Sequence, residues 1–319
     1  MRNGAYHCAF TRAESWAKAF AMTNTPSDQA LIDNLARLLH VEQSGENLFT
    51  GSPQPGGVGR VFGGQVIAQA LQAAQATIGK EKTAHSLHAY FLRGGEEGPP
   101  IDYAIETDFD GRSFANRRVV ASQSGKPILN LSASFQRAED GLEHQAAVMP
   151  NVTLPEDLPT DREMRQKMLD QFADTMSDAQ RALFMRPRPL EMRTEGRLHW
   201  MNSDPKPPVA HSWFRTVAPL PDDPALHRAV IAYASDYTLL GTAALPHGLS
   251  WLRGELVSAS LDHTIWFHAD ARADEWLLYA TESPWSGGGR GFNRGHIFTR
   301  DGKLVASVAQ EGMIRRRKG

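Results

Sequence analysis

The sequence contains a long internal duplication with an offset of about 176 residues. The stretch IDYAIET at 101–107 matches LLYATES at 277–283, so Tyr103 corresponds to Tyr279. The match continues through the following turns and strands, and the offset changes only from 176 to 178. A match that includes strand-like segments and turns alike indicates two copies of one supersecondary unit. Two copies are too few for a solenoid, so we expect them to pack against each other as a closed pair.

Charge and cysteine content exclude several classes of protein. The 34 Lys and Arg residues nearly balance the 36 Asp and Glu residues and are scattered along the chain, which argues against a nucleic-acid partner. The basic run at 315–318 is interpreted as a solvated tail. A single cysteine, Cys8, excludes an intrachain disulfide and fits a reducing, cytoplasmic compartment. No apolar run reaches the roughly 18 to 20 residues that a membrane span requires.

Organised sequence begins near Pro26-Ser27-Asp28, which is a typical helix start. We therefore expect residues 1–24 to be a disordered extension, with Met22 as an alternative start of the protein. The expected domains are a first unit at 25–137, a polar linker at 138–160 that holds three prolines, and a second unit at 161–319.

Both copies predict one helix followed by antiparallel strands. In the first, a Gly/Pro-rich loop precedes Gly63-Gly64 and an Ala-rich helix closed by Gly79. In the second, Asp223 and Pro224 mark the helix start. The second unit also predicts a helix over 161–185. The pattern favours an α+β fold in which a long helix is wrapped by an antiparallel sheet, present twice. The expected strands are 85–93, 101–108, 113–123, 127–136, 190–200, 210–217, 256–268, 275–282, 291–299 and 304–312.

Six blocks of the sequence are informative: GRVFGGQVIAQAL from Gly59, HSLHAYFLR from His85, GRSFANRRV from Gly111, YASDYTLL from Tyr233, LDHTIWFH from Leu261 and EWLLYATES from Glu275. In this order they resemble the acyl-CoA thioesterase II family, and the resemblance extends from about Leu31 to Ile314. It implies a double hotdog fold and hydrolysis of acyl-CoA to free fatty acid and CoA, without a metal or organic cofactor. It also suggests a homo-oligomer, either a dimer or a tetramer.

The resemblance also implies a catalytic set. Thioester hydrolysis needs a nucleophilic water, a group that takes its proton, and donors for the oxyanion on the acyl carbon. Matching the family's blocks places these roles on Asp236, Ser260 and Gln310, all in the second copy. Several family members have Thr at the position of Ser260, so a hydroxyl remains but lacks the stiffness of a β-branched side chain.

The first copy is expected to be catalytically silent. At the position of Gln310 it has Ala133 or a near neighbour. Its expected role is to line the acyl pocket and to supply backbone N–H groups around Gly63 and Gly64. These glycines lie at a helix start, which suits either an oxyanion or a phosphate.

Other readings of single residues remain. A lone Asp near a helix end is commonly a cap or a surface charge. His85, His88, His263 and His268 lack Cys or acidic partners at ligand spacing, so we interpret them as strand histidines rather than metal ligands. The Asp262-His263 pair is interpreted as structural or as support for the site.

Two other functions are kept as alternatives. One is an enoyl-CoA hydratase-like enzyme on the same scaffold, and the other is a non-catalytic acyl-CoA-binding protein. A serine-nucleophile hydrolase is disfavoured because the chain contains no G-x-S-x-G motif. The glycine run at 287–291 lies between strands, so a hairpin turn explains it better than a dinucleotide loop does.

Overall fold

The structure is a computed structural model that describes residues 26–54, 59–172, 178–195, 204–249, 251 and 253–317. The expected extension at 1–24 lies outside these residues. The first half contains α2 (Asp28–Leu39), β1 (Val41–Gly45), β2 (Leu48–Gly51), α3 (Gly63–Ala76), β3 (Lys82–Phe91), β4 (Ile101–Asp110), β5 (Phe114–Gln123) and β6 (Lys126–Arg137). The second contains η1 (Pro155–Asp157), α4 (Asp161–Phe172), α5 (Asp178–Phe184), β7 (Leu190–Thr194), β8 (Val209–Thr216), α6 (Pro224–Ser235), η4 (Leu239–His247), β9 (Leu256–Ser260), β10 (Asp262–Phe267), β11 (Leu277–Gly287), β12 (Arg290–Thr299) and β13 (Leu304–Arg316).

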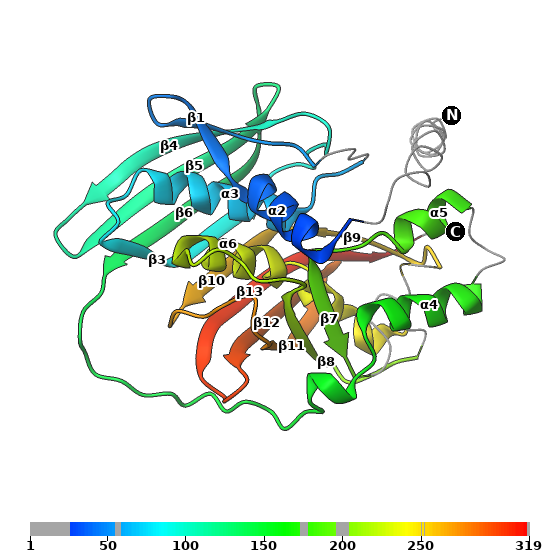
Figure 1. Ribbon diagram of the computed structural model, residues 1–319. Coiled ribbons are helices and arrows are strands. Elements are labelled where there is room, and N and C mark those ends of the chain that lie inside the picture. Colours follow the sequence, from blue (N-terminus) through cyan, green and yellow to red (C-terminus); the bar gives the residue numbers. More distant parts are fainter. Residues whose placement is uncertain are drawn as a thin grey trace.

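Among the described residues, thirteen strands form one continuous sheet that contains both copies of the repeat (Figure 1). The order β1-β2-β4-β5-β6-β3 continues into β10-β13-β12-β11-β8-β7, and β9 also pairs with β13. The second half of this order repeats the first in reverse, so the two copies pack side by side, as the duplication predicts. At the junction β3 and β10 are antiparallel, with Leu87 opposite Ile265, and neither side chain is exposed. Burying a Leu or Ile contributes about 1.5–3 kcal/mol, so this junction belongs to the core of the molecule.

The sheet curves around α3 and α6, which pack against each other. Ser27 caps α2, and the Asp223 side chain accepts a hydrogen bond from Ala225 N at the start of α6. Both central helices are almost entirely buried and rich in alanine, and the small side chains let them approach the sheet and each other closely. The sequence predicted a long helix wrapped by an antiparallel sheet, present twice, and in the structure the two sheets are continuous and the two helices are in contact.

Most predicted strands are confirmed to within a few residues, but some elements differ. The predicted strand at 256–268 is two strands, β9 and β10, which are separated at Leu261. Residues 190–200 and 210–217 correspond to β7 and β8, although 196–200 lie outside the described residues. Strands β1 and β2 and the helical segment η4 were not predicted. Within 161–185, α4 and α5 are described and residues 173–177 are not.

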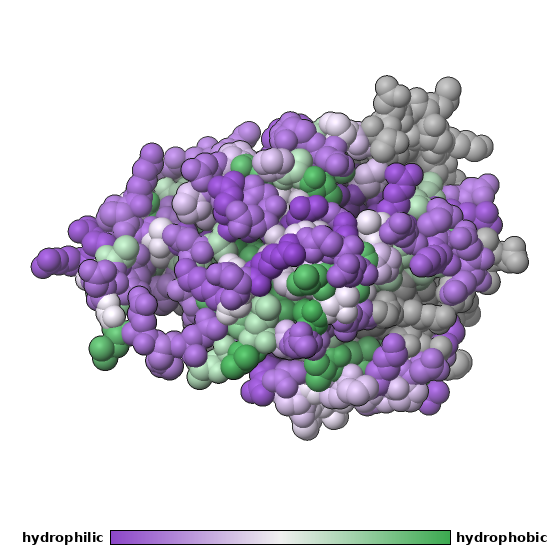
Figure 2. Space-filling model, turned by 60° about the horizontal axis from the view of Figure 1, so that its bottom comes forward, coloured by the Kyte–Doolittle hydropathy of each residue, from purple (hydrophilic) through white to green (hydrophobic). Residues whose placement is uncertain are grey.

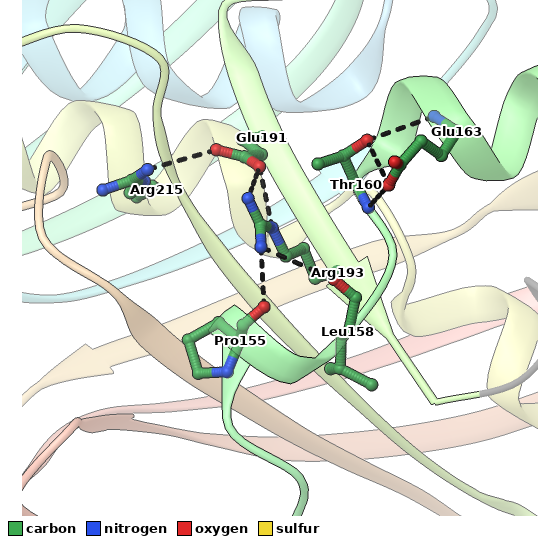
Figure 3. Close-up of polar contacts among 7 residues, drawn as sticks. All are labelled: Pro155, Leu158, Thr160, Glu163, Glu191, Arg193 and Arg215. Atoms are coloured by element: carbon green, nitrogen blue, oxygen red, sulfur yellow. Dashed lines mark hydrogen bonds and ion pairs between the residues drawn. The ribbon is translucent and has the colours of Figure 1, made fainter.

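The segment expected to be a linker packs against the outer face of the C-terminal sheet (Figures 1 and 3). Its backbone carbonyl at Thr153 accepts a hydrogen bond from the Trp213 indole at 2.9 Å, and the carbonyl of Pro155 accepts one from Arg193 at 2.7 Å. Apolar side chains of the same segment cover a small cluster that includes Trp276. Thr160 and Glu163 then form a capping box at the start of α4. Residues 147–160 are therefore part of the folded structure.

The surface shown in Figure 2 is mainly polar, and its apolar residues form separate patches. Two large exposed rings, Tyr90 and Trp266, lie on the central strands β3 and β10. In the described part of the chain, no helix has the length and apolar character needed to cross a bilayer.

Candidate active site

Three different elements bring Asp236, Ser260 and Gln310 together. Asp236 is the residue that ends α6, with φ −85° and ψ −6°, so its side chain leaves the helix as the backbone turns. Ser260 is the last residue of β9 and lies opposite Gly312 of β13. Gln310 precedes Gly312 by two residues and therefore presents its side chain on the same face of the strand. The strand pairing thus places the hydroxyl and the amide beside the end of α6.

The Gln310 amide connects the other two side chains. Its Nε2 lies 2.7 Å from Asp236 Oδ1 and 3.1 Å from Ser260 Oγ. An ionised carboxylate accepts hydrogen bonds only, so the amide must turn its nitrogen toward Asp236. Gln310 Oε1 is buried without a hydrogen-bond partner within the described residues. The set therefore holds a carboxylate, a hydroxyl whose hydrogen is not used by Gln310, and a buried acceptor oxygen.

The start of α3, from the first copy, contacts the Asp236 carboxyl group. The backbone N–H of Gly64 stabilises the charged form of this carboxyl, which also lies at the positive end of the helix dipole. At Gly63, an added Cβ would lie 2.7 Å from Asp236 Oδ2 and 2.9 Å from Phe91 Cζ. Only glycine allows the helix and the carboxylate to approach this closely.

Burial dominates the ionisation of Asp236. Its side chain is 6% exposed, and desolvation raises its pKa from 3.8 to about 6, although Gln310 and Gly64 stabilise the charged form. A carboxylate with this pKa is ionised at neutral pH and is a better proton acceptor than an ordinary aspartate.

His263 lies behind the carboxylate, and sequence reasoning assigned it only a supporting role. Its Nδ1 lies 3.8 Å from Asp236 Oδ1, and its Nε2 lies 2.8 Å from Ser235 Oγ. The ring is fully buried, and desolvation lowers its pKa to about 3, so it is neutral at physiological pH. Ser235 was not predicted, and the only sequence signal is its place before Asp236.

Asp262 does not join this set, although it is adjacent to His263 in the sequence. Adjacent strand residues face opposite sides of the sheet. Asp262 Oδ1 accepts a hydrogen bond from the Glu311 N–H at 2.6 Å, which connects β10 to β13. Its contact is therefore structural, as interpreted from the sequence.

The other histidines have strand contacts. His85 Nε2 lies 2.8 Å from Ser134 Oγ, and His268 Nε2 lies 2.8 Å from Ser307 Oγ. His88 stacks edge-on against Trp266 with ring centroids 5.3 Å apart. Within the described ranges, no group of three or more His, Cys, Asp or Glu side chains is arranged to hold a metal ion.

The corresponding place in the first copy is filled differently. Asn293 lies opposite Gln310 in the second copy, and Arg117 lies opposite Ala133 in the first, which matches the sequence expectation for Ala133. The Arg117 guanidinium is buried and donates to Thr77 Oγ1 at 2.9 Å and to the Thr77 carbonyl at 3.2 Å, where α3 ends. The first copy thus has Arg117 and Ala133 where the second copy has the amides of Asn293 and Gln310. At the end of its helix it has Thr77, where the second copy has Asp236.

Aromatic side chains surround the junction of α3 and α6, and sequence reasoning did not assign them to the site. The Phe62 ring contacts Tyr233 and Tyr237, with centroids 5.0 and 4.9 Å away. Phe91 packs beside Gly63 from the end of β3. Their positions depend on the packing of the two copies, which the residue spacing does not give.

These features define a class of protein that has a double hotdog fold. Its polar set, Asp236, Ser260 and Gln310, lies between the start of α3 and the end of α6. The fold matches a hotdog protein from Alicyclobacillus acidocaldarius with a TM-score of 0.67 at 18% identity, over 88% of this chain and 98% of that one. An acyl-CoA thioesterase II of Mycobacterium marinum matches with a TM-score of 0.71 at 39% identity, over 89% of this chain and 99% of that one.

Sequence comparisons give the family. Residues 180–313 match the acyl-CoA thioesterase model, and residues 52–136 match the acyl-CoA thioesterase N-terminal domain model. Acyl-CoA thioesterase 2 of Haemophilus influenzae is 40% identical over 285 residues, which cover 89% of this chain and 98% of that protein. The chain belongs to the acyl-CoA thioesterase family.

Proposed function

We propose that the protein hydrolyses acyl-CoA to a free fatty acid and CoA by direct attack of water, with Asp236 as the general base. The observation that carries this proposal is the Gln310 amide, which connects the raised-pKa carboxylate of Asp236 to the Ser260 hydroxyl. Membership of the acyl-CoA thioesterase family supports the choice of substrate.

In this mechanism Asp236 accepts a proton from water as the water oxygen bonds to the acyl carbon. The carbonyl electron pair moves onto the acyl oxygen, and the tetrahedral intermediate then collapses with cleavage of the C–S bond. The proton on Asp236 passes to the thiolate of CoA, which restores the carboxylate. Ser260 and Gln310 hold the water by hydrogen bonds, and Gln310 Oε1 is an acceptor for its second hydrogen.

The first copy contributes the other side of the site. The backbone N–H of Gly63, the first residue of α3, is the proposed donor to the oxyanion. Phe62 and Phe91, which flank the same helix start, are proposed to line the acyl pocket. This role is consistent with a first copy in which Arg117 and Ala133 stand at the places of Asn293 and Gln310.

The geometry does not favour the two alternatives. A hydratase would need a histidine that reaches the α and β carbons of the substrate, whereas His263 is fully buried and its Nε2 contacts Ser235. A protein that only binds acyl-CoA would not need a buried aspartate, which costs stability. Crotonyl-CoA distinguishes the hydratase, because hydration consumes it without release of thiol.

The first test is thiol release from saturated acyl-CoAs of increasing chain length, for the wild type and Asp236→Asn. We expect wild-type turnover with a chain-length optimum, and a loss of about 10²–10⁴-fold in kcat for the variant because it lacks the base. Folding of the variant is checked by circular dichroism. A folded Asp236→Asn protein with near-wild-type turnover would remove Asp236 from this role, and tight acyl-CoA binding without turnover by the wild type would favour a binder.

We also propose that the protein is a cytoplasmic homo-oligomer, a dimer or tetramer. The single cysteine supports a reducing compartment. The exposed rings of Tyr90 and Trp266, on the outer face of β3 and β10, support an association of sheets. Light scattering coupled to gel filtration measures the mass, and a monomer at micromolar concentration would contradict the oligomer.

A further inference from the structure

A buried hydrogen-bond chain leads from α6 to the carboxyl group of Asp236. The N–H of Asp236 donates to the carbonyl of Ala234 rather than to that of Ala232, which lies four residues back. The Ser235 hydroxyl donates to the Ala232 carbonyl at 2.8 Å. A hydroxyl has only one hydrogen, so Ser235 Oγ must accept the hydrogen bond that joins it to His263.

This assignment fixes the tautomer of His263. Its Nε2, 2.8 Å from Ser235 Oγ, carries the hydrogen, so Nδ1 carries a lone pair. Nδ1 is buried, has no hydrogen-bond partner among the described residues, and lies 3.8 Å from Asp236 Oδ1. Two acceptor atoms therefore face each other when Asp236 is ionised.

The arrangement disfavours the carboxylate and favours the carboxylic acid. The acid form of Asp236 has an O–H that Nδ1 can accept after a small approach of the two groups, whereas the ionised form offers no donor. On the proposed role of Asp236, the acid is the form that exists after the base has taken the proton from water. We infer that Ser235 and His263 are positioning residues, in which Ser235 holds the His263 ring with its Nδ1 lone pair toward Asp236 and thereby increases the basicity of that carboxylate.

His263 is the titratable side chain nearest to Asp236, and the other titratable groups around Asp236 have different partners. Tyr279, on β11, has its hydroxyl directed to the Ser235 carbonyl at 3.1 Å, and burial raises its pKa well above its ordinary value. Asp262 is engaged by the Glu311 N–H, and the charge of Glu311 adds to burial in raising the Asp262 pKa. Gln310, Ser260 and the Gly64 N–H complete the contacts and do not titrate near neutral pH.

Two variants, Ser235→Ala and His263→Gln, test whether these residues increase the basicity of Asp236 or have only a structural role. The measurement is the pH dependence of kcat/KM. In Ser235→Ala, His263 Nε2 loses the hydroxyl oxygen to which it donates. The ring hydrogen can then be on Nδ1, which donates it to the carboxylate of Asp236. In His263→Gln the amide keeps a donor for Ser235 but loses the acceptor toward Asp236. We expect both to move the acid limb of the profile to lower pH by about one unit and to lower kcat, because the base is weaker.

His227→Gln is the matched control. His227 is also a buried neutral histidine, at the start of α6, and its Nδ1 accepts the Ala273 N–H at 3.0 Å. We expect this variant to change stability without moving the acid limb. Acid limbs of Ser235→Ala and His263→Gln that superimpose on that of the wild type would overturn the inference, even if kcat were lower.

A second readout does not depend on activity. Nitrogen-15 NMR of the imidazole, assigned by the loss of signals in His263→Gln, reports which ring nitrogen carries the hydrogen. We expect Nε2–H in the wild type and Nδ1–H in Ser235→Ala, and Nδ1–H in the wild type would contradict the inference. A wild type that releases no thiol would refute the proposed function instead, and the NMR result would still decide the tautomer.

Discussion

At the residue scale, the proposed site consists of three side chains whose identities the sequence predicted and whose contacts it did not. The resemblance of whole blocks indicated Asp236, Ser260 and Gln310. It gave no sign that Gln310 donates to both partners, because that contact depends on the register of β13 with β9. The contact of His263 with Asp236 was missed for the same reason, since it crosses from β10 to the end of α6.

The pKa of Asp236 predicts the acid side of the pH profile. The group must be ionised to accept a proton, and burial raises its pKa to about 6. We expect kcat/KM of the wild type to fall about tenfold per pH unit below pH 6 and to level off above it. Rates measured with one acyl-CoA from pH 4.5 to 8 check this, and an acid limb centred near pH 4 would show that burial does not control the base.

Ser260 provides a matched pair of substitutions. Ser260→Ala removes the hydroxyl that accepts from Gln310, so the water loses one anchor and kcat should fall by about 10- to 100-fold. Ser260→Thr keeps the hydroxyl and adds a β-branch that restricts χ1, so activity should be retained. Steady-state kinetics on both variants measure the difference, and an Ala variant as active as the Thr variant would exclude a role for the hydroxyl.

At the element scale, the strongly periodic segments were predictable and the short ones were not. The helix over 63–76 and the strands β4 to β6 carry clear apolar patterns with readable turns, such as Ser124-Gly125, where both residues have positive φ. Strands β1 and β2 are only five and four residues long, and the apolar run of η4 contains Pro246, so neither shows a usable period.

The start of α3 gives the sharpest prediction at this scale. In Gly63→Ala the new Cβ would lie 2.7 Å from Asp236 Oδ2, so the carboxylate must move. We expect kcat/KM to fall on the order of 100-fold, since an ångström of misplacement has that effect, while the melting temperature changes less. Gly98→Ala is the control, because nothing lies within 4 Å of its Cβ position. Equal activity of the two variants would contradict the close approach.

At the scale of the whole molecule, the duplication predicted the architecture, and the proposed site uses both copies. The copies share a sheet through β3 and β10, and the first copy supplies the helix start that contacts the aspartate of the second. The packing of residues 147–160 against the outer face of the C-terminal sheet could not be predicted, because a polar, proline-rich segment carries no period.

The buried aspartate should also lower the stability of the whole molecule. Its pKa is about 6 in the folded protein and near 3.8 when unfolded, so the folded state binds the proton more tightly. The free-energy cost of ionising Asp236 in the folded state is absent below pH 3.8 and grows between pH 3.8 and 6. Above pH 6 it reaches about 3 kcal/mol, at 1.36 kcal/mol per pKa unit. We therefore expect Asp236→Asn to gain stability relative to the wild type as pH rises from 4 to 7. Urea unfolding at both pH values measures this, and a constant difference would contradict it.

The central claim is that a water activated by Asp236 attacks the acyl carbon. A single turnover in H₂¹⁸O, with enzyme in excess over acyl-CoA, tests this claim most directly. Direct attack places one ¹⁸O atom in the fatty acid and none in the protein, and mass spectrometry of both measures it. A first-turnover fatty acid without ¹⁸O, together with label in the peptide that contains Asp236, would show an acyl-enzyme on that carboxylate and contradict the account.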